Sequence, residues 1–151
     1  MAISQAMATS FKVQILDGVH NFGSGVVRAS TAADVFKLAL YTSSATLSAA
    51  TTAYSSADEV SSSGTNYPAG GLTLTISQAP TFTSTTAWLD FDDLTFPSAT
   101  ITANGALIYN ETQGNKAVAV LAFGGDKTST AGNFTIQFPS PTSTTAILRI
   151  A

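Results

Sequence analysis

Between Phe36 and Phe138, apolar residues recur at every second position of several short segments. They do so over residues 36–40, 72–76 and 134–138, where Phe, Leu and Ile alternate with Lys, Ala, Thr and Gln. An alternation of period two places the apolar side chains on one face of a β-strand and the others on the opposite face. Threonine suits the exposed face because its branched Cβ packs well on a pleated surface. The pattern therefore predicts strands with one buried and one exposed face.

Further segments extend this prediction to an all-β fold. Residues 106–110 and 146–150 are short strand candidates, and residues 116–123 are apolar on both faces, which suits a central strand or a subunit contact. Turn residues occur at Gly114-Asn115 and at 124–126. About one strand per 10–15 residues after residue 70 is typical of a sandwich or a barrel. We therefore expect an antiparallel β-sandwich or a jelly-roll-like barrel.

One irregularity lies within residues 88–96. Residues 89–92 alternate between apolar and acidic side chains, whereas Leu94 and Phe96 are out of phase with them by one residue. One extra residue near Asp92-Asp93 restores the phase. We predict a β-bulge or a sharp bend there.

The N-terminal region has a different period. Ala8, Phe11, Ile15 and Val19 fall on one stripe of a helix with 3.6 residues per turn. A serine at position 4 can cap its start, and a glycine at position 18 suits its end. These features predict a short α-helix over residues 4–16.

The length of 151 residues fits a single domain over 1–151. We divide it into an N-terminal helix and arm, residues 1–34, and a β-sandwich, residues 35–151. The sandwich contains a long loop, residues 43–71, that is rich in Ser, Thr and Ala and has Asp58 and Glu59 as its charged residues. A loop of this length in a small domain is usually functional or ordered by a neighbouring molecule.

Composition excludes several classes of function. Six Lys and Arg against nine Asp and Glu do not form the basic stripe of a nucleic-acid binder. The chain lacks cysteine, which excludes disulfides, thiol catalysis and cysteine–zinc sites. Residues 1–10 lack the features of a secretory signal, and no apolar run reaches the length of a transmembrane helix. We expect a soluble cytosolic product, or one assembled from the cytosol, with no cofactor and with neither nucleic acid nor membrane as a partner.

Charged residues make up 10% of the chain, against about 25% in an average soluble domain. With so few charges, strand edges and apolar patches are poorly protected against association. A protein that works inside an assembly does not need that protection. The composition is therefore typical of a structural subunit and not of an enzyme.

Asp90, Asp92 and Asp93 form the acidic cluster of the sequence. Asp90 and Asp92 are expected on one face of a strand, about 7 Å apart. They are candidates for a cation site, since clustered carboxylates bind calcium, or for a pair of general acid and base. The favoured interpretation is a solvated outward face that protects a strand edge, so we predict no metal site.

His20 and a group of aromatic residues each have a functional and a structural interpretation. A Ser-His-Asp triad would depend on His20, the single histidine, and no G-x-S-x-G motif supports it; we expect a hydrogen-bonded histidine after the helix. The aromatic residues with a polar end form either a sugar-binding platform or anchors of a core or interface. They are Tyr41, Tyr54, Tyr67, Trp88 and Tyr109.

Segments along nearly the whole chain resemble a group of small virion proteins of tailed bacteriophages. The order of the segments carries the resemblance more than any single motif does. The segments are residues 9–12, 18–22, 36–42, 58–60, 66–67, 69–71, 106–110 and 116–121. Pro68 departs from the pattern, where Thr or a similar residue is expected, so the turn before 69–71 is expected to differ in detail.

The resemblance implies a virion structural protein without catalytic residues. For some of these proteins the implied role is capsid decoration, or cement: binding the major capsid protein outside the shell, commonly as a homotrimer on threefold positions. We expect such a subunit on the capsid surface after assembly in the host cytoplasm. The alternative is a structural or carbohydrate-binding β module of the tail, neck or baseplate. The candidate residues for capsid or subunit contact are Phe11, Val19, Phe22, Tyr54 and Tyr67.

Overall fold

The computed structural model describes residues 2–8, 10–11, 15, 18–24 and 32–150. Within them, the strands are β1 (Ala6–Met7), β2 (Phe36–Tyr41), β3 (Leu72–Thr73), β4 (Ile76–Thr83), β5 (Thr86–Phe91), β6 (Leu94–Asn110), β7 (Lys116–Ile136) and β8 (Leu148–Ile150). They form two antiparallel sheets, in the orders β1-β7-β6-β2-β3 and β4-β5-β8. The predicted all-β fold is confirmed, and the two sheets fit a sandwich.

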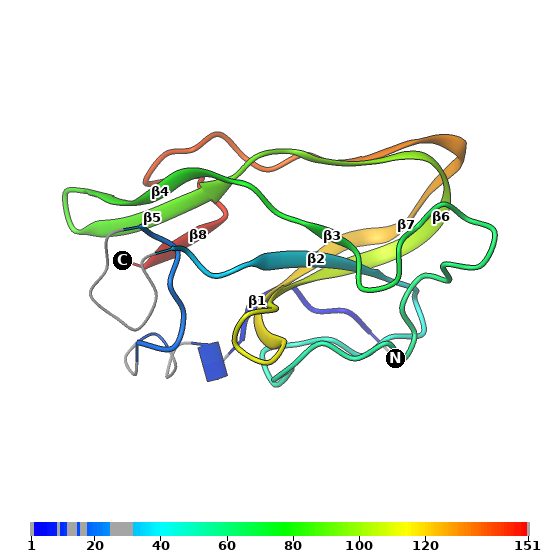
Figure 1. Ribbon diagram of the computed structural model, residues 1–151, viewed down its shortest axis with the longest axis horizontal. Coiled ribbons are helices and arrows are strands. Elements are labelled where there is room, and N and C mark those ends of the chain that lie inside the picture. The colour runs from blue at the N-terminus through cyan, green and yellow to red at the C-terminus, as the bar shows by residue number, and fades with distance from the viewer. Residues whose placement is uncertain (1, 9, 12–14, 16–17, 25–31, 151) are drawn as a thin grey trace.

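The strands β6 and β7 are much longer than the others. They pair from Leu94↔Ile136 at one end to Asn110↔Lys116 at the other. Figure 1 shows this hairpin running along the upper side of the molecule, bending at the right of the view and returning beside β2 in the lower layer. This hairpin of the five-stranded sheet therefore extends along both the upper and the lower side of the molecule.

The bend in the hairpin coincides with an irregular register. Asn104 of β6 corresponds to residues 123–126 of β7 between two regular pairs. Gly124 and Gly125 have φ angles of 71° and 143°, which glycine adopts without steric cost. The turn predicted at 124–126 is therefore wrong: the segment is part of a large bulge inside one strand, because β7 continues to pair with β6 on both sides of it.

Most of the other predicted strands are present with shifted ends. Residues 36–40 lie in β2, 106–110 in β6 and 116–123 in β7, while 134–138 and 146–150 are shortened to the end of β7 and to β8. The turn predicted at Gly114-Asn115 joins β6 to β7, and both residues have positive φ. The loop over 43–71 is also confirmed, since it contains only isolated bridges.

Two irregular segments mark two of the three points where the chain changes sheets. The strand predicted over 72–76 is split, because the Leu74 N–H bonds to Phe36 of the five-stranded sheet while the next carbonyl, that of Thr75, accepts from Asp92 N–H. The bend predicted at Asp92-Asp93 is confirmed, since β5 and β6 on either side of it belong to different sheets.

The helix predicted over residues 4–16 is not seen. Ser4 N–H bonds to the carbonyl of Leu47, and β1 pairs with β7. These sheet-edge hydrogen bonds occupy the backbone that a helix would use, so tertiary pairing overrides the local periodicity. Later in the range, Ser10, Phe11 and Ile15 are helical, and residues 9, 12–14 and 16 lie outside the described part.

The core fills the space between the two sheets. The Phe36 ring of β2 and the Phe91 ring of β5 have centroids 6.0 Å apart and so connect the layers. Tyr67 of the loop packs on Phe96 of β6 with centroids 5.4 Å apart. The long loop thus contributes to the core as well as to the surface.

Candidate functional site

The loop 43–71 closes the edges of the five-stranded sheet. β1 and β3 are only two residues long, so they cover little of the outer edges of β7 and β2. Bridges fix the loop along these edges, joining Leu47 to Ile3, Ala53 to Lys116 and Glu59 to Tyr41. A covered edge has fewer free backbone groups with which another strand can pair.

The carboxylate of Glu59 holds the loop in place. Its Oε1 accepts hydrogen bonds from Tyr67 Oη and from Gly70 N–H, both at 2.7 Å, and its Oε2 accepts from Tyr54 Oη at 2.7 Å. Tyr67 Oη in turn accepts from Leu40 N–H at 2.9 Å. One carboxylate therefore links three positions of the loop to β2.

The other two tyrosines complete this cluster, which we call the tyrosine latch: Tyr41, Tyr54, Glu59, Tyr67, Gly70 and Tyr109. Tyr109 Oη donates to Gly70 O at 2.8 Å and Tyr41 Oη donates to Ser55 O at 2.6 Å. The Tyr54 ring stacks on that of Tyr109 at a centroid distance of 4.7 Å. All four tyrosines of the chain thus bind the loop to the sheet.

Burial raises the pKa of every tyrosine in the latch. The pKa of Tyr109 rises to about 12, by desolvation and then by the negative charges of Glu111 and Glu59. The pKa values of Tyr41, Tyr54 and Tyr67 are raised further, chiefly by desolvation, and Glu59 adds to the rise at each. The hydroxyls are therefore neutral donors at physiological pH, as the latch requires.

The aromatic residues do not form the sugar-binding platform that was one interpretation of the sequence. Tyr41, Tyr67 and Tyr109 are buried, and Tyr54 is half-buried. Trp88 lies in β5, on the other sheet, where its indole N–H donates to Thr83 Oγ1. The tyrosines are internal anchors, because their rings and hydroxyls are used within the chain.

The acidic cluster is not one solvated face. Asp90 is 1% exposed, whereas Asp92 and Asp93 are exposed and follow the end of β5. Asp93 Oδ1 accepts from Phe138 N–H at 2.8 Å. The prediction that Asp90 and Asp92 share an outward face is wrong, because the chain bends between them. Among the described residues, no group of three His, Cys, Asp or Glu is placed to hold a metal ion.

Asp90 is an acid buried in the structure. Desolvation raises its pKa above the usual range, and the backbone N–H groups of Phe91 and Ile147, which donate to it, oppose that rise. With its carboxylate enclosed, a substrate does not reach this group in the observed conformation. Asp90 therefore connects β5 to the segment before β8.

His20 belongs to a polar network under the N-terminal segment. Its Nδ1 lies 3.0 Å from Asn110 Nδ2, which also donates to Asp34 Oδ2 at 2.9 Å. Asn21 N–H donates to the same Asp34 oxygen at 3.0 Å, and the Gln113 amide donates to Oδ1 at 3.3 Å. The expected hydrogen-bonded histidine is confirmed, and its neighbours in this network are amides and a carboxylate.

The inner face of the β4–β5–β8 sheet is covered at one end and open at the other. The partners Leu89 and Leu148 are buried, whereas the next row on the same face contains Phe82, Ala87 and Ile150. Phe82 is 75% exposed and Ile150 is 50% exposed. We call this row, with the pocket beside it, the open end.

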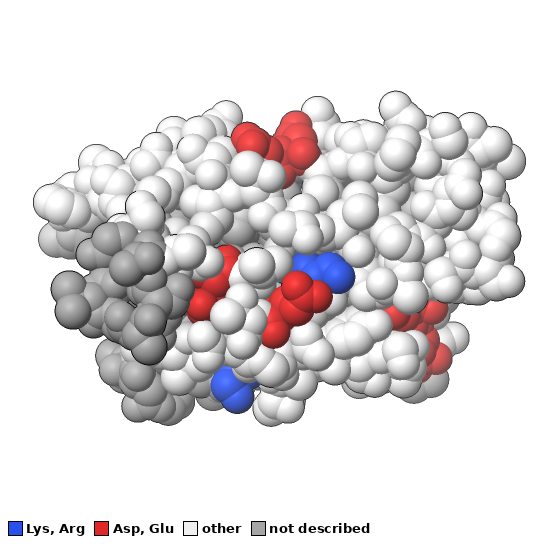
Figure 2. All heavy atoms as spheres, viewed as in Figure 1, with Lys and Arg blue, Asp and Glu red and all other residues white. Residues whose placement is uncertain are grey.

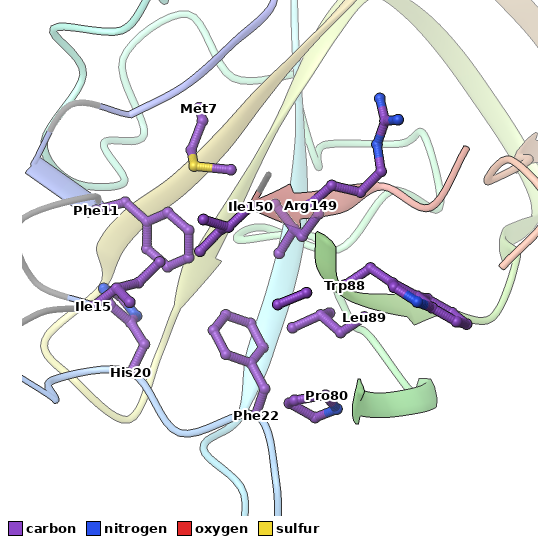
Figure 3. A pocket seen from close by; sticks show the side chains of 12 residues that line it. Met7, Phe11, Ile15, His20, Phe22, Pro80, Trp88, Leu89, Arg149 and Ile150 are labelled. Atoms are coloured by element: carbon purple, nitrogen blue, oxygen red, sulfur yellow. The ribbon is translucent and has the colours of Figure 1, made fainter. Parts of the chain in front are cut away.

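The pocket at the open end has a volume of about 160 Å³. Its walls are mainly apolar and include Phe11, Phe22, Leu89 and Ile150. Figure 3 shows the rings of Phe11 and Phe22 and the side chains of Leu89 and Ile150 directed toward a common space, with the Trp88 ring and the Arg149 head group pointing away. The pocket therefore suits an apolar side chain and presents no cluster of reactive groups.

The five predicted contact residues occupy different environments. Phe11 and Tyr67 are 2% and 1% exposed and belong to the core. Phe22 is half-buried and stacks on Phe36 at 4.1 Å, while Val19 and Tyr54 are also half-buried. The structure brings Phe11 and Phe22 together at the pocket and places Tyr54 and Tyr67 together in the latch.

The sequence reasoning missed Phe82 and Ile150, the two most exposed large apolar residues of the described chain, ahead of Val35. A signal for Phe82 was present, because Ile76, Gln78, Pro80 and Phe82 occupy alternate positions between Ser, Ala and Thr. The exposure of Phe82 depends on where the opposite layer of the sandwich ends. The alternation of residues along one strand carries no information about that.

The surface shown in Figure 2 is mostly uncharged, with scattered acidic and basic groups over a large neutral area. In the part of the chain that the structure describes, no helix is long and apolar enough to cross a bilayer. No protein-family model matches this chain, and neither a curated protein nor a solved structure matches it.

Proposed function

We propose that this protein is a virion structural subunit of a tailed bacteriophage, a capsid decoration or cement protein that binds the major capsid protein on the outer shell and stabilises the head. The observation that carries the proposal is the open end, where Phe82 and Ile150 expose apolar surface beside an apolar pocket. Contiguous exposed apolar surface is typical of interaction sites. An assembly subunit gains free energy by burying it.

Two other features support an adhesive role. The low content of charged residues, 10% of the chain, leaves association unopposed by charge repulsion. The resemblance of the ordered segments to small phage virion proteins points to the same class. The proposed subunit is not an enzyme, and it acts as a homotrimer whose many copies on the shell add avidity to weak single contacts.

Contact with the capsid is assigned to the partly exposed candidates. Val19, Phe22 and Tyr54 are half-buried, so each retains surface for a partner, whereas Phe11 and Tyr67 act from the core by holding their neighbours in place. Tyr54 lies in the loop 43–71, which the latch fixes to the sheet. A fixed loop loses little conformational entropy on binding.

The test is the number of copies in purified particles of the virus that encodes the chain, measured by quantitative mass spectrometry with the major capsid protein as the internal reference. Decoration of the shell predicts on the order of hundreds of copies, because each contact repeats over the lattice. A copy number of a few dozen or fewer assigns the protein to the neck, tail or baseplate instead. Absence from particles contradicts a virion function.

A further inference from the structure

Phe82 protrudes beside a pocket that it does not fill. It lies next to the end of β4, and its cross-strand partner Ala87 is paired in turn with Ile150. Ala87 and Ile150 line the pocket, but Phe82 is not among the lining residues. A ring that is 75% exposed and an apolar pocket therefore lie side by side on one face.

The pocket matches the size of an aromatic ring. Its volume is about 160 Å³, and an apolar protein cavity of about 150 Å³ binds benzene. The rings of Phe11 and Phe22 form part of its wall, and aromatic pairs gain energy beyond the area that they bury. A phenylalanine side chain from outside the chain fits this site in both size and chemistry.

We propose that the open end is a contact between two copies of this chain, in which Phe82 of one copy enters the pocket of the other. Because the surface carries both the protruding ring and a ring-sized pocket, Phe82 of each copy can enter the pocket of the next copy, and such a head-to-tail contact closes into a ring, as a homotrimer requires. A different partner would need only one of the two features. The inference rests on the self-association that the proposed function includes, and it names the surface responsible.

The contact uses side chains and not added strands. Pro80 in the edge strand β4 has no N–H to donate, and the β4–β5 register is irregular between Gln78 and Thr81, so β4 is a poor template for a further strand. Arg149 is the one Lys, Arg, Asp or Glu among the described residues that line the pocket; it donates to Thr144 O, and its head group points away from the pocket in Figure 3. Two copies therefore meet without like charges at the centre.

The exposed area sets the strength of this contact. The accessible surface area of the Phe82 side chain is about 150 Å² at its present exposure. A stable interface buries about 800 Å² of accessible surface on each partner. The open end thus provides the central apolar contact of an interface that is smaller than a stable dimer requires. We expect weak, concentration-dependent association in the micromolar range, which many copies in one assembly reinforce.

The experiment is sedimentation velocity of the full chain over a series of concentrations. Phe82→Ser removes the ring and is expected to weaken association at least tenfold, as is typical of a central aromatic residue (about 1.4 kcal/mol or more). Val35→Ser is the matched control, because Val35 is another exposed apolar residue at 40% exposure but is not part of the open end. It should leave association unchanged.

A mixing experiment tests the pairing itself. Ala87→Phe blocks the pocket mouth but keeps Phe82, whereas Phe82→Ser keeps the pocket, so each variant alone should remain monomeric and the mixture should associate. Circular dichroism and thermal unfolding confirm that each variant is folded. If Ala87→Phe does not fold, Phe82→Ser and Val35→Ser decide the outcome.

Three results overturn the proposed contact: a wild-type chain that is monomeric at every concentration, unchanged association of Phe82→Ser, or a mixture that fails to associate. None of these alters the copy number in particles, which tests the virion function separately. A monomeric chain found in hundreds of copies on the shell removes this contact and leaves decoration in place.

Discussion

The edge region of the five-stranded sheet and the inner face of the β4–β5–β8 sheet differ in how they are covered. The first is covered by the loop 43–71, which the carboxylate of Glu59 and four tyrosines hold in place. The second extends past its covering layer and ends in exposed Phe82 and Ile150. The chain covers the first surface with its own loop and leaves the second exposed.

The largest effect is expected where the covering loop returns to the sheet. A Cβ at Gly71 would lie 1.8 Å from Leu38 O, at a φ of +73°. We expect Gly71→Ala to cost more than about 4 kcal/mol, because the backbone of β2 would have to move. Urea unfolding followed by circular dichroism measures this loss.

Gly64→Ala is the matched control for that substitution. Gly64 has almost the same φ, +71°, but has nothing within 4 Å of the added Cβ. It should cost only the strain of a left-handed alanine, about 1–2 kcal/mol. Equal unfolding midpoints for the two variants would show that the close approach at Gly71 is unimportant.

The next largest effect is expected at the centre of the latch. Glu59→Ala leaves the donors of Tyr54, Tyr67 and Gly70 without their acceptor, and we expect a loss of about 3 kcal/mol in the free energy of unfolding. The control is Glu111→Ala, which removes an exposed carboxylate 3.4 Å from Lys37 Nζ and should cost less than about 1 kcal/mol. Similar losses in the free energy of unfolding for both variants would mean that the latch contributes little to stability.

The latch also predicts a loss of stability at alkaline pH. The folded-state pKa of Tyr109 is about 12, above its ordinary value of 10.0, so the unfolded chain releases the proton first. The stabilisation is complete below about pH 10 and is lost as the pH rises toward 12. Urea midpoints measured across this range should fall.

Tyr109→Phe separates this titration from general alkaline unfolding. The variant loses the hydrogen bond to Gly70 O, which lowers stability by about 1 kcal/mol at neutral pH. Its midpoint should then fall less steeply above about pH 10, since one raised pKa has been removed. A decline as steep as that of the wild type contradicts the role assigned to Tyr109.

The smallest effect is expected at the open end. Phe82→Ser should change the free energy of unfolding of the monomer by less than about 0.5 kcal/mol, because the ring is exposed in its own chain. Phe96→Ala, in the core, should cost about 3–5 kcal/mol by comparison. Measurement at low protein concentration keeps association out of the result. A large loss for Phe82→Ser would show that the ring packs within its own chain.

Sequence periodicity predicted the strands well where burial alternates regularly. It identified residues 36–40 and the bend at Asp92-Asp93, because both leave a local trace in the order of apolar residues. Periodicity failed over residues 4–8, and turn composition failed over 124–126, because these residues pair with the distant strands β7 and β6. Local patterns do not report which distant strand supplies the hydrogen bonds.

The candidate site was predicted less well for the same reason. The tyrosines were recognised as a group, but Glu59 was noted only as a charge in a loop, and nothing local indicates that three donors converge on it. Phe82 was overlooked although its alternation was visible. Whether an aromatic side chain is buried as an anchor or exposed as a contact depends on whether the opposite layer of the sandwich covers it, and the local sequence does not show this.

The hairpin of β6 and β7 also bears on how the molecule acquires its structure. Its pairing starts at a short turn, Asn110↔Lys116, and extends to Leu94↔Ile136, so closure from the turn outward needs only small loops at each step. As the hairpin lengthens past its bulge, it extends from the lower to the upper side of the molecule. We therefore expect the longest strand pair of the five-stranded sheet to form from its turn outward, in many short steps, while β4, β5 and β8 pair separately in the other sheet.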